Sequence, residues 1–97
     1  MNLESMRQNA QEAVKLLKAV SNENRLFILC HLLEQEMSVG EMNEKLGLSQ
    51  SALSQHLAVL RKDHLVSTRK EAQTVFYSVA SNDVKKLMET LHELYCS

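Results

Sequence analysis

The stretch Leu48–Val66, LSQSALSQHLAVLRKDHLV, sets polar but almost uncharged side chains between apolar residues at helical spacing. Leu53, Leu57 and Leu60 recur at i, i+4 and i+7 and therefore predict one buried face of a helix. The opposite face carries only serine and glutamine: Gln50, Ser51, Ser54 and Gln55. A solvated helix face more usually carries Glu and Lys, which favour helix and form i,i+4 ion pairs. The composition of this face indicates contact with another molecule.

This helix follows another helix after a very short turn. Ser38, with Glu41 three residues later, forms the pattern of a capping box and predicts a helix that ends at Leu46. Gly47 supplies the stop, and Ser49 can cap the helix that follows. Two helices joined by a tight glycine turn are typical of a helix-turn-helix.

The flanking sequence adds further helices and a hairpin. Apolar spacing predicts a helix over about residues 3–19, and Ser21 or Asn22 can cap a second, nearly all-apolar and therefore buried helix through about Leu33. The runs LVSTRK and TVFYSV, separated by Glu71, Ala72 and Gln73, predict a β-hairpin, and helical spacing returns from Asn82. The predicted fold is mainly α with a hairpin wing, in the order ααααββα: a winged helix-turn-helix whose hairpin leans on the helices.

Length and composition support one domain over residues 1–97. The chain is 44% hydrophobic and 24% charged, with 2 Gly and no Pro, as expected of a globular, largely helical protein. No apolar run is long enough to cross a membrane and the N-terminus lacks the pattern of a secretory signal, so we expect a cytoplasmic protein. The net charge is −1, but residues 49–79 carry four basic and two acidic side chains, or +2, which leaves −3 for the remainder. The basic charge is concentrated beside the serine- and glutamine-rich helix.

These features favour DNA binding. Glutamine pairs well with adenine edges, and serine can donate or accept at several base edges. Basic side chains beside the helix would contact phosphates: Arg61, Lys62, Arg69 and Lys70. Alternatively, the polar face merely solubilises the protein, and Lys62 and Lys70 pair with Asp63 and Glu71. We expect no enzyme, because the chain has no Gly-rich phosphate loop, His-Glu-x-x-His motif or nucleophile elbow.

The segment LSQSALSQHLAVLRKDHLVSTRKEAQTVFYSV, together with LLKAVSNENRLFIL before it, resembles the DNA-binding core of the ArsR family of bacterial winged-helix regulators. The resemblance implies a homodimer through the first and last helices, bound to double-stranded DNA at an inverted repeat, with an A/T-rich operator as one option. It places Arg69 and Lys70 on the wing, and a longer set on the recognition helix: Gln50, Ser51, Ser54, Gln55 and His56. His56 could equally belong to the core. His64 departs from the family, which commonly has Gly there, so the turn into the wing could differ.

The resemblance implies neither a metal nor another cofactor. Soft-metal sensors of the family are similar in a Cys-Val-Cys on the third helix, where this chain has Ser38 and Gly40, which offer no thiolate. Zinc and nickel sensors place an Asp-x-His and a later His pair on the last helix. This chain reads Asp83-Val84-Lys85, with only His92 downstream.

The two cysteines, Cys30 and Cys96, have a plain and a functional interpretation. A buried cysteine is often a small core residue, and a C-terminal one is often accidental. However, the chain most resembles the family branch of HlyU-type regulators and sulfide- and persulfide-responsive repressors, which has one Cys in the second helix and one near the end of the last. The resemblance implies a redox switch through Cys30 and Cys96, and haemolysin-type virulence genes as one regulon. A regulator without a switch and a protein-interaction module remain the alternatives.

Overall fold

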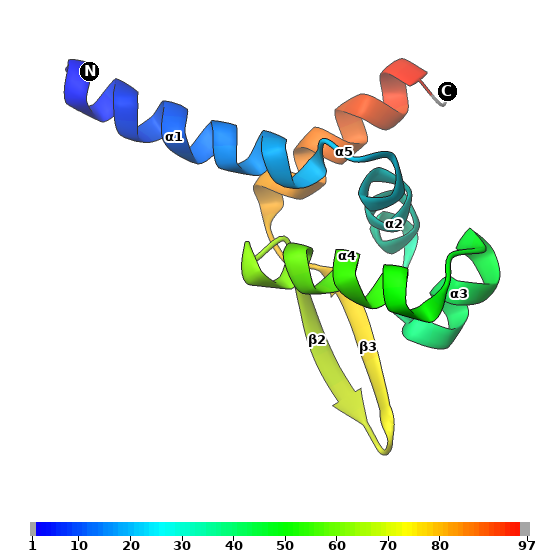
Figure 1. The fold of residues 1–97 in the computed structure, drawn as a ribbon. Coiled ribbons are helices and arrows are strands. Elements are labelled where there is room, and N and C mark those ends of the chain that lie inside the picture. The colour runs from blue at the N-terminus through cyan, green and yellow to red at the C-terminus, as the bar shows by residue number, and fades with distance from the viewer. Residues whose placement is uncertain (1, 96–97) are drawn as a thin grey trace.

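The computed structural model describes residues 2–95 and contains five helices and three short strands (Figure 1). The elements are α1 (Leu3–Val20), α2 (Glu23–Glu34), β1 (Met37–Ser38), α3 (Val39–Leu46), α4 (Gln50–Lys62), β2 (Val66–Glu71), β3 (Thr74–Val79) and α5 (Asn82–Tyr95). The predicted mainly helical fold with a hairpin wing is confirmed. The structure adds one element to the predicted order, the strand β1.

The helix boundaries follow from local capping. Asn22, rather than Ser21, caps α2 by accepting a hydrogen bond from the main-chain N–H three residues on. The capping box of α3 is complete: Ser38 Oγ accepts from the Glu41 N–H at 3.2 Å, and Glu41 Oε1 accepts from the Ser38 N–H at 3.0 Å. These bonds satisfy amides that a helix start otherwise leaves without partners.

The core is built around α2, as predicted from its apolar composition. Ile28 and Leu29 are fully buried on this helix, while Phe27, on its outer side, is 48% exposed. Helix α2 packs against α1, α3, α4, α5 and β3. The largest fully buried side chains are Ile28, Leu29, Met37, Met42, Leu53, Leu57, Leu60, Met88 and Val84.

The three strands form one antiparallel sheet in the order β1-β3-β2, in which Met37 pairs with Tyr77. A strand of two residues is too short to show an alternating pattern, so the sequence gives no signal for β1. The hairpin turn is also tighter than predicted, because Glu71 pairs with Thr74 inside the sheet and only two residues remain between the strands. The hairpin projects well beyond the helices (Figure 1).

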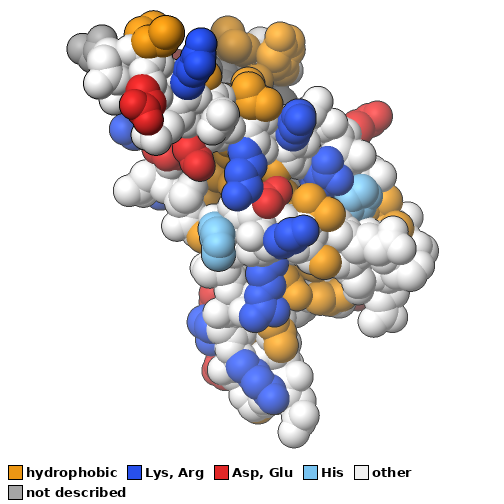
Figure 2. Space-filling model, turned by 60° about the vertical axis from the view of Figure 1, so that its left-hand side comes forward, with side chains coloured by type: hydrophobic (Ala, Val, Ile, Leu, Met, Phe, Trp, Pro, Cys, Tyr) orange, Lys and Arg blue, Asp and Glu red, His pale blue; other side chains and the backbone are white. Residues whose placement is uncertain are grey.

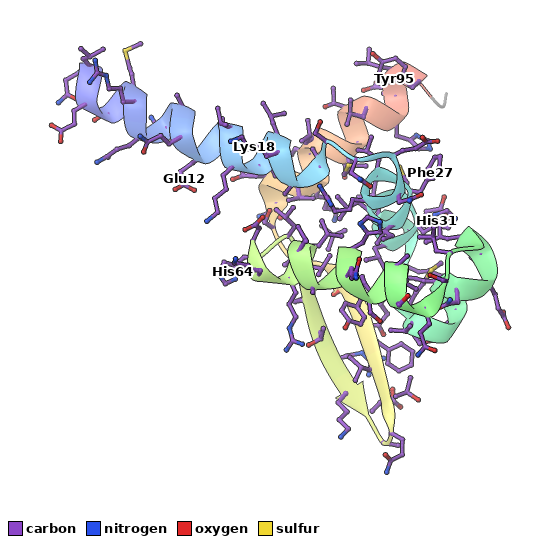
Figure 3. The ribbon with its side chains drawn as sticks, viewed as in Figure 1. Glu12, Lys18, Phe27, His31, His64 and Tyr95 are labelled. Atoms are coloured by element: carbon purple, nitrogen blue, oxygen red, sulfur yellow. The ribbon has the colours of Figure 1, made fainter. Side chains whose placement is uncertain are left out.

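The two terminal helices leave apolar side chains uncovered. The N-terminal part of α1 extends away from the rest of the chain (Figure 1), and only Ala19 and Val20, at its end, are buried. Tyr95, at the far end of α5, points away from the body (Figure 3) and is 81% exposed. The large exposed apolar side chains on these helices are Leu3, Met6, Val14, Leu17, Leu94 and Tyr95. Within residues 2–95, no helix combines the length and the hydropathy needed to cross a membrane.

His64 makes the turn between α4 and β2 in a left-handed conformation, with φ of 62°. Its N–H donates to the Arg61 carbonyl at 3.1 Å, and the Leu65 N–H donates to the Leu60 carbonyl at 2.8 Å. This pair of bonds is a Schellman motif, in which glycine is the usual left-handed residue. His64 therefore adopts the turn in which the family commonly has glycine. Its side chain is exposed and points away from the body (Figure 3).

We predict that His64→Val lowers the free energy of unfolding by about 1–2 kcal/mol relative to His64→Gly, because a β-branched residue is strained at positive φ. The His64→Gly variant should stay close to wild type, since relief of strain offsets the entropy that glycine loses on folding. Urea unfolding of the three proteins at one protein concentration measures this. Equal stability of the Val and Gly variants would contradict a left-handed turn.

Candidate nucleic-acid interface

A short glycine turn fixes the angle between α3 and α4. Gly47 has φ of 67° and ψ of 18°, and its N–H donates to the Asn43 carbonyl at 3.1 Å. The Asn43 side chain then donates from Nδ2 to the Leu48 carbonyl at 2.8 Å. Because a left-handed glycine and a side-chain bond hold both ends of the turn, the predicted helix-turn-helix is a defined unit.

The predicted two faces of α4 are confirmed. Leu53, Leu57 and Leu60 are buried against the body. The side chains predicted to read DNA are all exposed on the other side: Gln50, Ser51, Ser54 and Gln55. His56 is half-buried at the border between the two faces. The exposed face of α4 thus offers amide and hydroxyl groups without a single charged side chain before Arg61.

The two ends of α4 differ in charge. Ser49 caps its start by accepting from the Ala52 N–H at 3.2 Å, and the first turn contains no acidic residue. The positive end of the helix dipole therefore has no carboxylate beside it, an arrangement that suits a phosphate group. Arg61 and Lys62 occupy the last turn, where both are exposed and where cations also stabilise the helix itself.

Lys and Arg side chains follow one another from the helices down onto the wing on one side of the molecule (Figure 2). Side chains alternate between the two faces of a strand, so Lys70 shares the face of Val66, which is buried against the helices. Arg69 lies on the opposite, outer face of the sheet. The structure thus separates the two wing residues that were predicted together as phosphate contacts.

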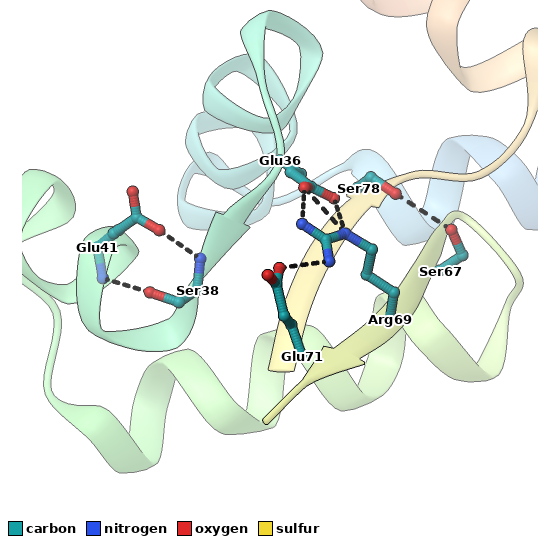
Figure 4. A network of polar contacts seen from close by, with 7 residues as sticks. All are labelled: Glu36, Ser38, Glu41, Ser67, Arg69, Glu71 and Ser78. Carbon is teal, nitrogen blue, oxygen red and sulfur yellow. Dashed lines mark hydrogen bonds and ion pairs between the residues drawn. The ribbon is translucent and has the colours of Figure 1, made fainter. Parts of the chain in front are cut away.

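The Arg69 guanidinium is already engaged by carboxylates (Figure 4). Its Nε donates to both carboxylate oxygens of Glu36 at 2.9 Å, Nη2 also donates to Glu36, and Nη1 donates to Glu71 at 2.8 Å. The guanidinium carbon lies 4.6 Å from the centre of the Phe76 ring. Glu36 and Phe76 had not been predicted as parts of the site. Glu36 is 33 residues from Arg69 in the chain, so no local pattern could have indicated this pair.

The sequence left open whether Lys62 and Lys70 pair with Asp63 and Glu71, and the ion pairs of the structure answer this. Glu71 pairs with Arg69 and not with Lys70, and within residues 2–95 neither Lys62 nor Lys70 forms an ion pair. The hydrogen bond from Arg69 lowers the pKa of the Glu36 carboxyl, and partial desolvation opposes that shift only in part. Glu36 and Arg69 are therefore both charged at neutral pH.

Cys30 is half-buried on α2, beside a hollow of about 230 Å³ between α2 and α5. The hollow is also lined by Leu33, Glu34, Glu89 and His92. Cys96, the other residue of the predicted redox pair, lies outside the described residues. Across the part of the chain that the structure describes, no three His, Cys, Asp or Glu side chains are grouped so that they could hold a metal ion.

Comparison with known proteins matches residues 22–68 to the family described as bacterial regulatory protein, arsR family. The chain is 64% identical to the transcriptional activator HlyU of Vibrio cholerae over 96 residues, which cover 99% of this chain and 89% of that protein. It is 49% identical to the nodulation protein NolR of Rhizobium meliloti, over 91% of this chain and 72% of that protein. The structure of reduced HlyU from Vibrio cholerae superposes with a TM-score of 0.94 at 62% identity, covering 98% of this chain and all of that one.

Proposed function

The chain belongs to the ArsR family and is a DNA-binding transcriptional regulator, and from this we propose that the exposed face of α4 reads base edges in the major groove. The observation that carries the proposal is the exposed, uncharged row of Ser and Gln opposite the buried leucines of α4. Amides and hydroxyls form specific hydrogen bonds with base edges, whereas lysines would contact any phosphate. The reading set is Gln50, Ser51, Ser54 and Gln55, with His56 at its border.

Phosphate contacts would hold α4 in register on the duplex. Arg61 and Lys62 extend from the end of the helix, and Lys70 extends from the wing, where it shares the face of the sheet that turns toward the helices. The start of α4, whose first turn contains no acidic residue, supports a further phosphate contact at the positive end of the helix dipole. Since such contacts carry no sequence information, they give affinity without selectivity.

We predict that Gln55→Ala reduces the discrimination between operator and random duplex by about 1–3 kcal/mol, because one base-edge contact is lost. Fluorescence anisotropy with both duplexes measures it. The control is Lys62→Ala, which should weaken both duplexes alike and lower the slope of log K against log salt by about 0.9. If Gln55→Ala weakened both duplexes equally, Gln55 would not read a base.

The uncovered apolar faces of α1 and α5 support a homodimer. Leu17 is 53% exposed and Leu94 is 67% exposed, although both lie on the apolar stripes of their helices. An exposed stripe of this kind marks an interaction site in soluble proteins. A second copy packed against it would place two α4 helices on one duplex. An inverted-repeat operator with half-sites about 34–36 Å apart fits this arrangement.

We expect Leu17→Glu to shift the protein from dimer to monomer, because the introduced carboxylate would be desolvated in the interface. Sedimentation equilibrium measures the shift. Gln8→Glu adds the same charge on the opposite side of α1, where Gln8 is exposed, and should leave the dimer intact. A Leu17→Glu protein that stays dimeric would place the interface elsewhere.

We further propose that oxidation or reactive sulfur switches DNA binding through Cys30 and Cys96. The hollow beside Cys30 supports this proposal, because it gives a small oxidant access to the thiol from the side of α5. Cys96 follows His92, another lining residue, by four positions in the sequence. A relative with 62% identity has been described specifically as reduced HlyU. Two thiols that form a disulfide release two protons and two electrons, which cleave one S–S bond of a polysulfide into two shorter fragments, each ending in an S–H group.

We predict that polysulfide treatment weakens operator binding by at least tenfold and that a reductant restores it. Anisotropy titration of duplex from the gene's own upstream region measures both states. Cys30→Ser and Cys96→Ser should bind as the reduced protein does and should not respond. Binding that is indifferent to treatment would favour a regulator without a thiol switch, and absence of salt-dependent binding would favour a protein-interaction module.

The genes under control are a separate proposal. The likeness to HlyU supports a regulon that includes haemolysin-type virulence genes. Mapping of bound sites across the genome of the source bacterium tests this. The proposal requires occupied sites upstream of such genes, and their absence would contradict it.

A further inference from the structure

We propose that Arg69 positions the wing and does not contact DNA, and that Lys70 is the wing residue that contacts phosphate. The proposal rests on the DNA-binding mode proposed above. It reassigns one of the basic residues that the sequence had grouped together. Three observations carry it: the path of the Arg69 side chain across the sheet, the engagement of its nitrogens, and the opposite orientation of Lys70.

The Arg69 side chain crosses the sheet from one edge toward the other. Arg69 lies on β2, and directly opposite it on the central strand β3 is Phe76, whose ring lies under the guanidinium. Glu36, which holds the far end, immediately precedes the other edge strand, β1. Because the sheet order is β1-β3-β2, this contact ties the outer strand of the projecting hairpin to the body of the protein (Figure 4).

The engagement of the guanidinium leaves it poorly suited to a phosphate. All three of its nitrogens donate to carboxylates: Nε and Nη2 to Glu36 and Nη1 to Glu71. Arg69 with its two partners carries a net charge of −1, counted as one cation and two carboxylates. A cluster with this charge offers no net attraction to a DNA backbone. Arg69 binds Glu36 through two nitrogens and Glu71 through a third. An exposed ion pair of this bidentate, networked kind holds a defined geometry, whereas an isolated surface pair does not.

Lys70 has the opposite properties. It is exposed and, among residues 2–95, forms no ion pair. It lies on the other face of β2 from Arg69, in register with Val75 near the tip of the hairpin. An unpaired lysine near the projecting tip can reach a phosphate once α4 is in the groove, whereas Arg69 points to the outer side.

The test compares two neighbouring cations on the same strand. Arg69→Gln and Lys70→Gln each remove one positive charge, and their operator affinities are measured by anisotropy at several salt concentrations. Lys70→Gln should lower the slope of log K against log salt by about 0.9, as for one lost phosphate contact. Arg69→Gln should leave the slope unchanged and weaken binding about twofold to fivefold, because the wing is less well held.

Glu36→Gln separates positioning from a simple charge effect. If Glu36 acts through Arg69, Glu36→Gln weakens binding by a similar factor, and the double variant with Arg69→Gln is no weaker than either single variant. Three outcomes would each overturn the proposal. The first is tighter binding by Glu36→Gln, and the second is additive losses of affinity in the double variant. The third is a change of the salt slope in Arg69→Gln equal to that in Lys70→Gln.

A measurement without DNA keeps the proposal independent of the DNA-binding mode. In wild-type protein the pKa of Glu36 lies below its ordinary value, so the ion pair is present at neutral pH and is lost only as the pH falls through that lowered pKa. Carboxyl NMR titration should show this pKa rising in Arg69→Gln but not in Lys70→Gln. Amide relaxation should show a more mobile wing in Arg69→Gln alone, and equal mobility in both variants would overturn the positioning role. Wild-type protein without salt-dependent binding would refute the proposed function instead.

Discussion

The rest of the structure depends on the burial of the leucines of α4 against the central helix. Leu53, Leu57 and Leu60 are buried in the same core as Ile28 and Leu29 of α2. Burial of side chains of this size contributes about 1.5–3 kcal/mol each and fixes the rotation of the helix about its own axis. Since a helix has only one opposite face, that rotation alone determines that Ser and Gln point outward. The base-edge selectivity that we propose for this face would therefore be set by apolar packing on the other side of the same helix.

The wing obeys a different constraint. A two-stranded hairpin is marginal in water and needs a third strand or a packed face. This chain supplies both at the base of the wing, where Met37 pairs with Tyr77 and the buried Val66 lies on the same face. On the outer face of the same base, where Phe76 pairs with Ser38 of β1, the contact from Arg69 over Phe76 to Glu36 adds a polar tie across the sheet. The helices are thus oriented by burial, whereas the hairpin is held by burial on its inner face and by a polar contact on its outer face.

Sequence patterns predicted the features that arise locally. Capping residues and the left-handed glycine defined the starts of α2, α3 and α4 and the turn between the last two, because these depend on side chains within a few positions of one another. The strand β1 and the pairing of Glu36 with Arg69 were not predictable, because the first is too short for a period and the second joins residues 33 positions apart. The pairing of charges was likewise not predictable from the sequence alone, because ion pairs can join residues that are distant in the chain. A count of basic residues treated Arg69 and Lys70 alike, although only the fold shows which of them is already paired.

The position of α2 also suggests how a change at Cys30 would reach DNA. This helix touches α4, which carries the proposed reading face, and it ends two residues before Glu36, which holds the wing. A protein core is close-packed, so a helix that is pulled by a new covalent bond displaces its neighbours instead of moving within a gap. A bridge between Cys30 and Cys96 would therefore act on both proposed DNA contacts at once, on α4 through leucine packing and on the wing through the carboxylate of Glu36. In the dimer that we propose, the same displacement would occur in both subunits, so the two shifts would add in the spacing between the two α4 helices.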